Sequence, residues 1–142
     1  MAINPRVLVT GDRGWTNVEV IQLAIKALPP DAIVIHGAAS GADTLAATIA
    51  TSYGLATMAF PAQWARFGKR AGPIRNQRML DEGKPDFVVA FHNYLPGSKG
   101  TRDMVTKARL ALIPVQLFNS LGQQIEVTDE LLSPVETTAG HA

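Results

Sequence analysis

Two glycine-rich segments of the chain have the composition of turns that hold phosphate groups. One reads HGAASGAD (His36–Asp43) and the other PGSKGTRD (Pro96–Asp103), and each leads into a segment of helical character. Glycine lets backbone N–H groups approach an anion closely, and the start of a helix adds unpaired N–H groups and partial positive charge. In the second segment, Lys99 and the Thr101 hydroxyl offer further donors. These features predict contacts to a phosphorylated ligand.

Neither segment is diagnostic alone, since GAASGA is not a strict dinucleotide fingerprint and GSKGT lacks the Walker A spacing. Short turns also need glycine for purely conformational reasons. Support comes from the stretch between Thr44 and Leu80, which has no Asp or Glu. Its basic residues are Arg66, Lys69, Arg70, Arg75 and Arg78. In a chain of net charge +1, such a local excess favours a small anionic ligand over a long nucleic acid, although a solvated charged loop is the simpler alternative.

Apolar runs alternate with amphipathic segments along the chain, and this predicts a single Rossmann-like α/β domain of three layers. The predicted strands are Arg6–Gly11, Ala32–Gly37, Ala56–Pro61, Asp86–Phe91 and Ile113–Phe118. The predicted helices are Asn17–Leu28, Gly41–Gly54, Pro73–Gly83 and Gly100–Ala111. The sheet of about five strands should be mainly parallel, and QQIEVT is a candidate for one added antiparallel strand near the C-terminus. We expect the domain to span residues 1–132 and a flexible tail to span 133–142.

In an open parallel sheet, ligands bind beyond the carboxyl ends of the strands, where the strand order switches. The unusual residues of this chain fall in the loops that follow the first four predicted strands, so we expect them to converge. Arg13, Arg75 and Arg78 can each bind phosphate or carboxylate in a bidentate manner. Trp15 or Trp64 can stack on a base.

Composition excludes several other classes of protein. The 142 residues include no cysteine, so disulfides and thiolate chemistry are absent. We see no secretion signal and no apolar run of about 20 residues, and therefore expect a cytoplasmic protein. The three histidines have no metal-ligand spacing, and Ser40 and Ser98 have no obvious partner base. We predict neither a metal nor a cofactor.

The segments RVLVTGDRGW, IVIHGAASGAD, FPAQWARFGKRAGPIRNQRML and GSKGTRDMVTKAR together resemble the YspA-type branch of the SLOG superfamily, over about Arg6–Val115. The resemblance implies a Rossmann-like fold that binds nucleotides or ADP-ribose-like molecules. It is shared with the Lonely Guy phosphoribohydrolases and the DNA-processing protein of natural transformation. Transferred by position, it implies ligand contacts at Gly11, Asp12, Arg13, Gly37, Gly41, Asp43, Arg75, Asn76, Arg78, Gly97, Gly100 and Thr101. To these we add Trp15, Ser40, Ser98 and Lys99 as candidate binding residues.

The chain departs from these relatives at informative positions. Many have serine in place of Asp12 and a second glycine in place of Ala38. The Lonely Guy hydrolases carry PGGxGTxxE, and the position of their catalytic glutamate is Met104 in this chain. Cleavage of an N-glycosidic bond needs a carboxylate to stabilise the oxocarbenium-like state and orient water, so Asp12 and Asp103 are the candidate catalytic residues.

Three functions therefore stay open. The first is a binding protein for a nucleotide or ADP-ribose-like molecule, acting as sensor or sequestering protein. The second is an N-glycosidic hydrolase of such a ligand, and the third is a single-stranded nucleic-acid binder. Relatives commonly pair through the helices beside the sheet, which implies a homodimer or larger homo-oligomer.

Overall fold

A six-stranded sheet in the order β3-β2-β1-β4-β5-β6 organises the computed structural model, which describes residues 4–133. The strands are β1 (Arg6–Gly11), β2 (Ile33–His36), β3 (Ala56–Ala59), β4 (Phe87–Phe91), β5 (Val115–Phe118) and β6 (Gln124–Ile125). The first five are parallel, and β6 pairs antiparallel with β5. The predicted Rossmann-like fold class is confirmed, including the added antiparallel strand.

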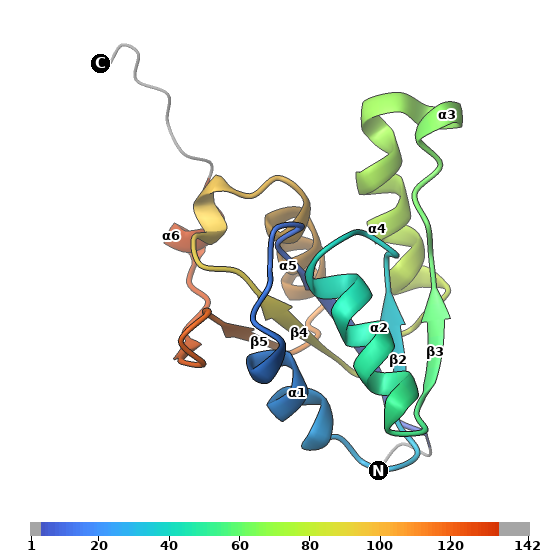
Figure 1. Cartoon of the computed structure of the whole chain (residues 1–142). Coiled ribbons are helices and arrows are strands. Elements are labelled where there is room, and N and C mark those ends of the chain that lie inside the picture. The colour runs from blue at the N-terminus through green and yellow to red at the C-terminus, as the bar shows by residue number, and fades with distance from the viewer. Residues whose placement is uncertain (1–3, 134–142) are drawn as a thin grey trace.

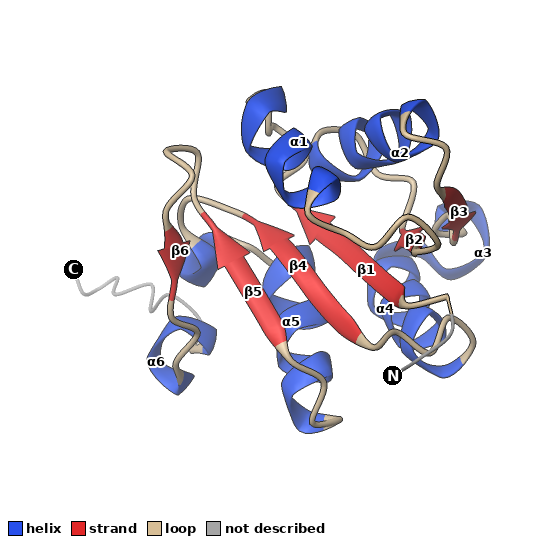
Figure 2. Cartoon of the chain, turned by 90° about the horizontal axis from the view of Figure 1, so that it is seen from below, coloured by secondary structure: helices blue, strands red, loops and turns tan. Residues whose placement is uncertain are grey.

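Helices cover both faces of the sheet (Figures 1 and 2). On one face lie α1 (Val18–Lys26) and α2 (Ala42–Ser52), and on the other lie α4 (Ala71–Asp81) and α5 (Gly100–Leu110). Two apolar clusters fill the spaces between the layers, and side chains of β1, β2 and β4 point alternately into one and the other. This alternation follows from the period of two in a strand, and it explains why these central strands are almost wholly apolar.

The strand order places β1 beside β4 at the centre of the sheet. The chain leaves β1 toward α1 on one face and leaves β4 toward α5 on the other face. The two connections diverge, and a crevice opens between them at the carboxyl edge. The strand order thus determines where a ligand site can form.

The structure differs from the predicted elements around the basic stretch. Residues expected to be irregular form α3 (Trp64–Phe67) and one 3₁₀ turn, η1 (Gly68–Arg70), which lie next to the start of α4. Helix α4 begins at Ala71 rather than Pro73. Proline is compatible with this position because the first-turn N–H groups of a helix have no intrahelical partner.

Two further short elements follow β4 and β6, namely η2 (Leu95–Gly97) and α6 (Asp129–Leu132). Helix α6 lies within the predicted domain of residues 1–132, and its first turn is capped by Thr128, whose Oγ1 accepts from the Leu131 N–H at 3.4 Å. Residues 134–142 of the predicted tail lie outside the described residues. Over the described part of the chain, the longest helices have 11 residues, and none is long and apolar enough to cross a bilayer.

Candidate functional site

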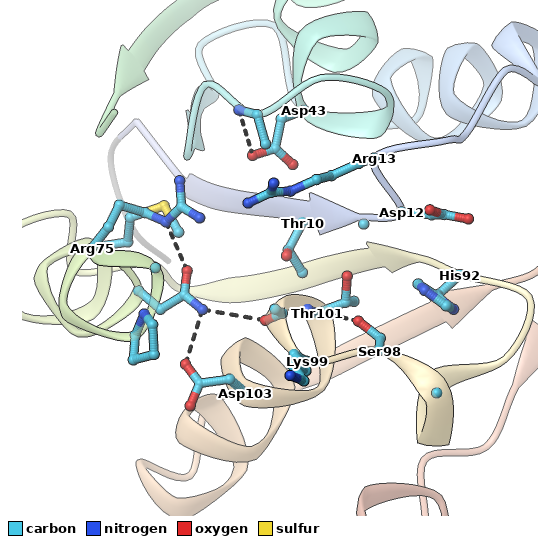
Figure 3. A pocket seen from close by; sticks show the side chains of 18 of the residues that line it. Thr10, Asp12, Arg13, Asp43, Arg75, His92, Ser98, Lys99, Thr101 and Asp103 are labelled. Atoms are coloured by element: carbon cyan, nitrogen blue, oxygen red, sulfur yellow. Dashed lines mark hydrogen bonds between the residues drawn. The ribbon is translucent and has the colours of Figure 1, made fainter. Parts of the chain in front are cut away.

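A cleft of about 640 Å³ lies at the carboxyl edge of the sheet, where the loops after β1 and β4 meet the first turns of α2, α4 and α5. Its volume is in the range typical of small-molecule sites. Figure 3 shows its side chains converging from these separate elements. Candidate binding residues from the sequence that line it are Gly11, Asp12, Arg13, Asp43, Arg75, Asn76, Gly97, Ser98, Lys99, Gly100 and Thr101.

The loop that leads into α5 presents open backbone donors to the cleft. The Ser98 hydroxyl accepts from the Thr101 N–H at 3.0 Å and so caps the helix. The N–H groups of Lys99 and Gly100 have no protein acceptor among residues 4–133. Unpaired N–H groups at the start of an 11-residue helix attract an anion. This end of the cleft can therefore hold a phosphate.

The loop that leads into α2 is satisfied by its own side chains. One carboxylate oxygen of Asp43 accepts from the N–H groups of Gly37, at 2.9 Å, and Ala39, at 3.4 Å. The Ala38 N–H donates to Nδ1 of His36 at 3.0 Å. A phosphate approaching this loop would have to displace a carboxylate that is already in place, so we assign the loop no phosphate contact through these donors.

Burial makes Asp43 an unusual acid. Its side chain is 5% exposed, and burial raises its pKa from 3.8 to about 6. The loop N–H groups and the positive charges of Arg75 and Arg13 act in the opposite direction, favouring the charged form. Its second carboxylate oxygen has no donor within the described residues. A buried carboxyl with a pKa near neutrality is characteristic of functional sites.

Arg75 is held rigidly at the wall of the cleft. Its Nη1 donates to the Gly37 carbonyl at 2.5 Å and its Nε donates to the Asn76 side chain at 2.9 Å. Asn76 in turn donates to the Gly100 carbonyl, at 3.2 Å, and to Asp103, at 2.9 Å. These contacts tie α4 to the loop after β2 and to the first turn of α5. The guanidinium is thereby oriented before any ligand arrives.

Arg13 and Trp64 form the outer wall. The Arg13 guanidinium lies over the Trp64 ring, 5.3 Å from its centroid. Both side chains are exposed and line the cleft. Burial lowers the pKa of Arg75, and the nearby positive charge of Arg13 adds to that effect. Two guanidinium groups close enough to repel each other favour an anion between them.

The remaining carboxylates at the cleft have structural partners. Asp103 accepts from Asn76 and also from Lys107, at 2.5 Å. One oxygen of Asp12 accepts from the Gly14 N–H at 2.9 Å, which forms an Asx turn. Residues 4–133 contain no group of three His, Asp or Glu side chains suited to a metal ion.

Met104 has no exposed surface and packs in the cluster between the sheet and the α4–α5 layer. The adjacent Asp103 is the residue of this turn that reaches the cleft. The geometry expected of a glutamate at position 104 is therefore not available to the methionine, which serves the core.

Several candidate residues lie outside this cleft. Trp15 is 4% exposed, its ring packs 5.6 Å from that of Phe91, and its Nε1 donates to the Asn17 carbonyl, so it belongs to the core. Arg78 is paired with Glu82 on the surface at 2.9 Å.

Three residues of the loop after β2 also stand apart from the cleft. Gly37 and Ser40 line a neighbouring hollow instead. Gly41 has a φ of 73°, and a Cβ there would collide with the Asp12 and Arg13 carbonyls. Its role is to let the loops after β1 and β2 meet.

The structure adds residues that the sequence did not single out for the cleft, namely Thr10, Ala39, Lys69, Gly72, Pro73, Met79 and His92. Trp64, considered there beside Trp15, is the tryptophan that lines it. His92 directly follows β4, and its Nδ1 accepts from the Tyr94 N–H at 3.0 Å. Burial lowers its pKa. Its position at a strand end was the available signal, but its type was weighed only as a metal ligand.

Comparisons with known proteins agree with this architecture. The model of the YspA, cpYpsA-related SLOG family matches residues 5–67. The Gene 61 protein of Mycobacterium phage D29 is 34% identical over 122 residues, which cover 80% of this chain and 95% of that protein. DNA processing protein A (DprA) from Streptococcus pneumoniae aligns with a TM-score of 0.63 at 18% identity, over 81% of this chain. The aligned region is 50% of the DprA chain, and the likeness is one of fold.

Proposed function

Because the chain belongs to the YspA, cpYpsA-related SLOG family, we propose that it binds a nucleotide or a nucleotide-derived, ADP-ribose-like molecule in the cleft, as a sensor or sequestering protein. One observation carries the proposal. The open first turn of α5 and the guanidinium groups of Arg13 and Arg75 line a single cleft (Figure 3). Hydrogen-bond donors and positive charges placed in this way suit a phosphorylated ligand.

Calorimetric titration with a panel of nucleotides tests the proposal, and Arg13→Ala is its sharpest variant. Arg13 is exposed and its guanidinium makes no hydrogen bond within residues 4–133, so its removal should leave the fold intact. We expect binding to weaken by about 1.5–3 kcal/mol, the contribution of a charged hydrogen bond.

The matched control is Arg78→Ala, which removes an arginine outside the cleft and should leave affinity unchanged. Equal effects of the two substitutions, or no binding of any nucleotide to the native chain, would refute the proposed site.

Hydrolysis of the same ligand is the alternative, and Asp43 is the observation that favours it. Its free oxygen, its burial and its pKa of about 6 fit a group that activates water or protonates a leaving base. Water would add across the N-glycosidic bond to give free base and ribose phosphate. Mass analysis after incubation separates the functions, because a binding protein returns the nucleotide intact.

Two other expectations stay predictions. Single-stranded nucleic-acid binding would show affinity that falls steeply with salt, which oligonucleotide titrations at several salt concentrations would measure. A homodimer or larger homo-oligomer would be detected by sedimentation equilibrium.

A further inference from the structure

A second hollow of about 330 Å³ adjoins the cleft on the side of β2 and β3. We call it the side hollow; Ala38, Ala39, Ser40, Pro61 and Ala62 line it. It shares Arg13, Trp64 and Arg75 with the cleft. The two spaces are therefore separated only by side chains that belong to both, and one ligand can extend from one into the other.

Arg75 supplies an independent sign that a ligand group lies at this junction. The side chain is 8% exposed, and its hydrogen bonds use Nε and Nη1 only. Within residues 4–133, Nη2 has no acceptor. A buried charged donor without a partner is costly, and this one borders both spaces. An anionic group between Arg75 and Arg13 would satisfy it.

The two ends of the combined site differ in chemistry. The side hollow has small apolar walls at Ala38, Ala39, Pro61 and Ala62, with the Trp64 ring beside them, which suits a flat base. The opposite end of the cleft lies beyond β1 and is bordered by Thr10, Asp12, His92 and Ser98. Such side chains suit the hydroxyl groups of a sugar.

Since β2 and β4 flank β1 in the sheet, these two ends lie on opposite sides of the phosphate donors. A mononucleotide would fill only one side of the site.

We infer that the ligand is a nucleoside diphosphate that carries a sugar on its outer phosphate, with its base in the side hollow. The two phosphates lie between the arginine pair and the first turn of α5, and the sugar lies beside Thr10 and His92. This inference rests on the proposed function and specifies the ligand class of the same site.

The test compares ribose 5-phosphate, ADP and ADP-ribose on the native chain and on Ala62→Trp. The substitution fills the side hollow and leaves the α5 end of the cleft unchanged. We expect native affinity to rise from ribose 5-phosphate to ADP and again to ADP-ribose. In the variant, ADP and ADP-ribose should each bind about tenfold more weakly, the factor expected for loss of one stacked base, while ribose 5-phosphate binding stays the same.

Ala65→Trp is the matched control, because Ala65 is exposed on α3 and lines neither space. It should leave all three affinities at native values. If Ala62→Trp does not fold, as judged by circular dichroism, Ser40→Phe fills the same hollow from an exposed position on the opposite loop.

The outcomes are distinguishable. If the native chain binds none of the three compounds, the proposed function fails and this inference fails with it. If ribose 5-phosphate binds as tightly as ADP-ribose, or if filling the hollow weakens ADP-ribose no more than the control does, only the side-hollow inference is wrong. A selective loss of ADP and ADP-ribose supports it.

Discussion

The loop after β2 and the loop after β4 differ in what their backbone N–H groups contact. In the first, Asp43 and His36 accept from the N–H groups of residues 37–39. In the second, Ser98 accepts from Thr101 alone, and the preceding N–H groups stay open toward the cleft. Both loops are glycine-rich and both helices carry an aspartate in the first turn.

The difference lies in where each aspartate points. Asp43 turns back into its own loop, whereas Asp103 is held aside by Asn76 and Lys107. A glycine-rich turn before a helix therefore binds an external anion only when no internal carboxylate occupies its donors. The loop after β2 shows the occupied condition, and the loop after β4 shows the open one.

Gly100→Asp should convert the open loop into an occupied one, with the largest expected effect. A Cβ at Gly100 meets nothing within 4 Å, so the side chain has room. The new carboxylate would lie at the phosphate position, and like charges in contact cost on the order of several kcal/mol of binding. Stability should stay the same or rise by about 0.3–1 kcal/mol, since acidic residues favour helix N-termini. Titration calorimetry and thermal melting measure the two quantities.

Gly100→Asn is the control for Gly100→Asp, because it has the same size without charge. If both variants bind nucleotide equally, or if the aspartate variant keeps native affinity, phosphate does not lie at the first turn of α5.

Asp43→Asn tests the occupied loop through pH. Because burial raises the pKa of Asp43 to about 6, the folded protein keeps a proton that the unfolded chain releases above about pH 4. Native stability therefore falls as pH rises from about 4 to 6, by about 3 kcal/mol for a shift of about two pKa units. Asparagine keeps an acceptor for Gly37 and Ala39 but does not titrate.

Urea unfolding at several pH values measures this effect. The free energy of unfolding of Asp43→Asn minus that of the native chain should increase by about 3 kcal/mol between about pH 4 and pH 7. A difference that is constant with pH would show that Asp43 titrates normally in the folded state.

The sequence was sufficient for the fold and for the elements that surround the cleft. Central strands such as Val7–Val9 and Val88–Phe91 are continuously apolar, and glycine punctuation marks their ends, so both strand type and loop position could be predicted. Membership of the cleft was harder to predict. Trp15 and Trp64 are the same residue type, and only packing against Phe91 buries the first.

Hydrogen-bond partners could not be predicted at all from single positions. The carboxylate of Asp43 and the guanidinium of Arg75 both engage Gly37, from two different helices. Their meeting depends on how α2 and α4 pack against the sheet. Sequence spacing does not specify that geometry, and it decides which loop is open.

The smallest effects should separate the roles of the two loop glycines. At Gly37 a Cβ would collide with the Arg75 guanidinium, whose Nη1 donates to the Gly37 carbonyl. Gly37→Ala should therefore lower stability by about 1–3 kcal/mol, the usual cost of overpacking, and should weaken nucleotide binding because Arg75 moves. Gly100→Ala places a methyl group in open space and should keep stability or raise it by up to about 1 kcal/mol. Urea unfolding of both variants measures these changes. If Gly100→Ala is the more destabilising of the two, then glycine is required at the open loop for its backbone, and the assignment of these two roles must be exchanged.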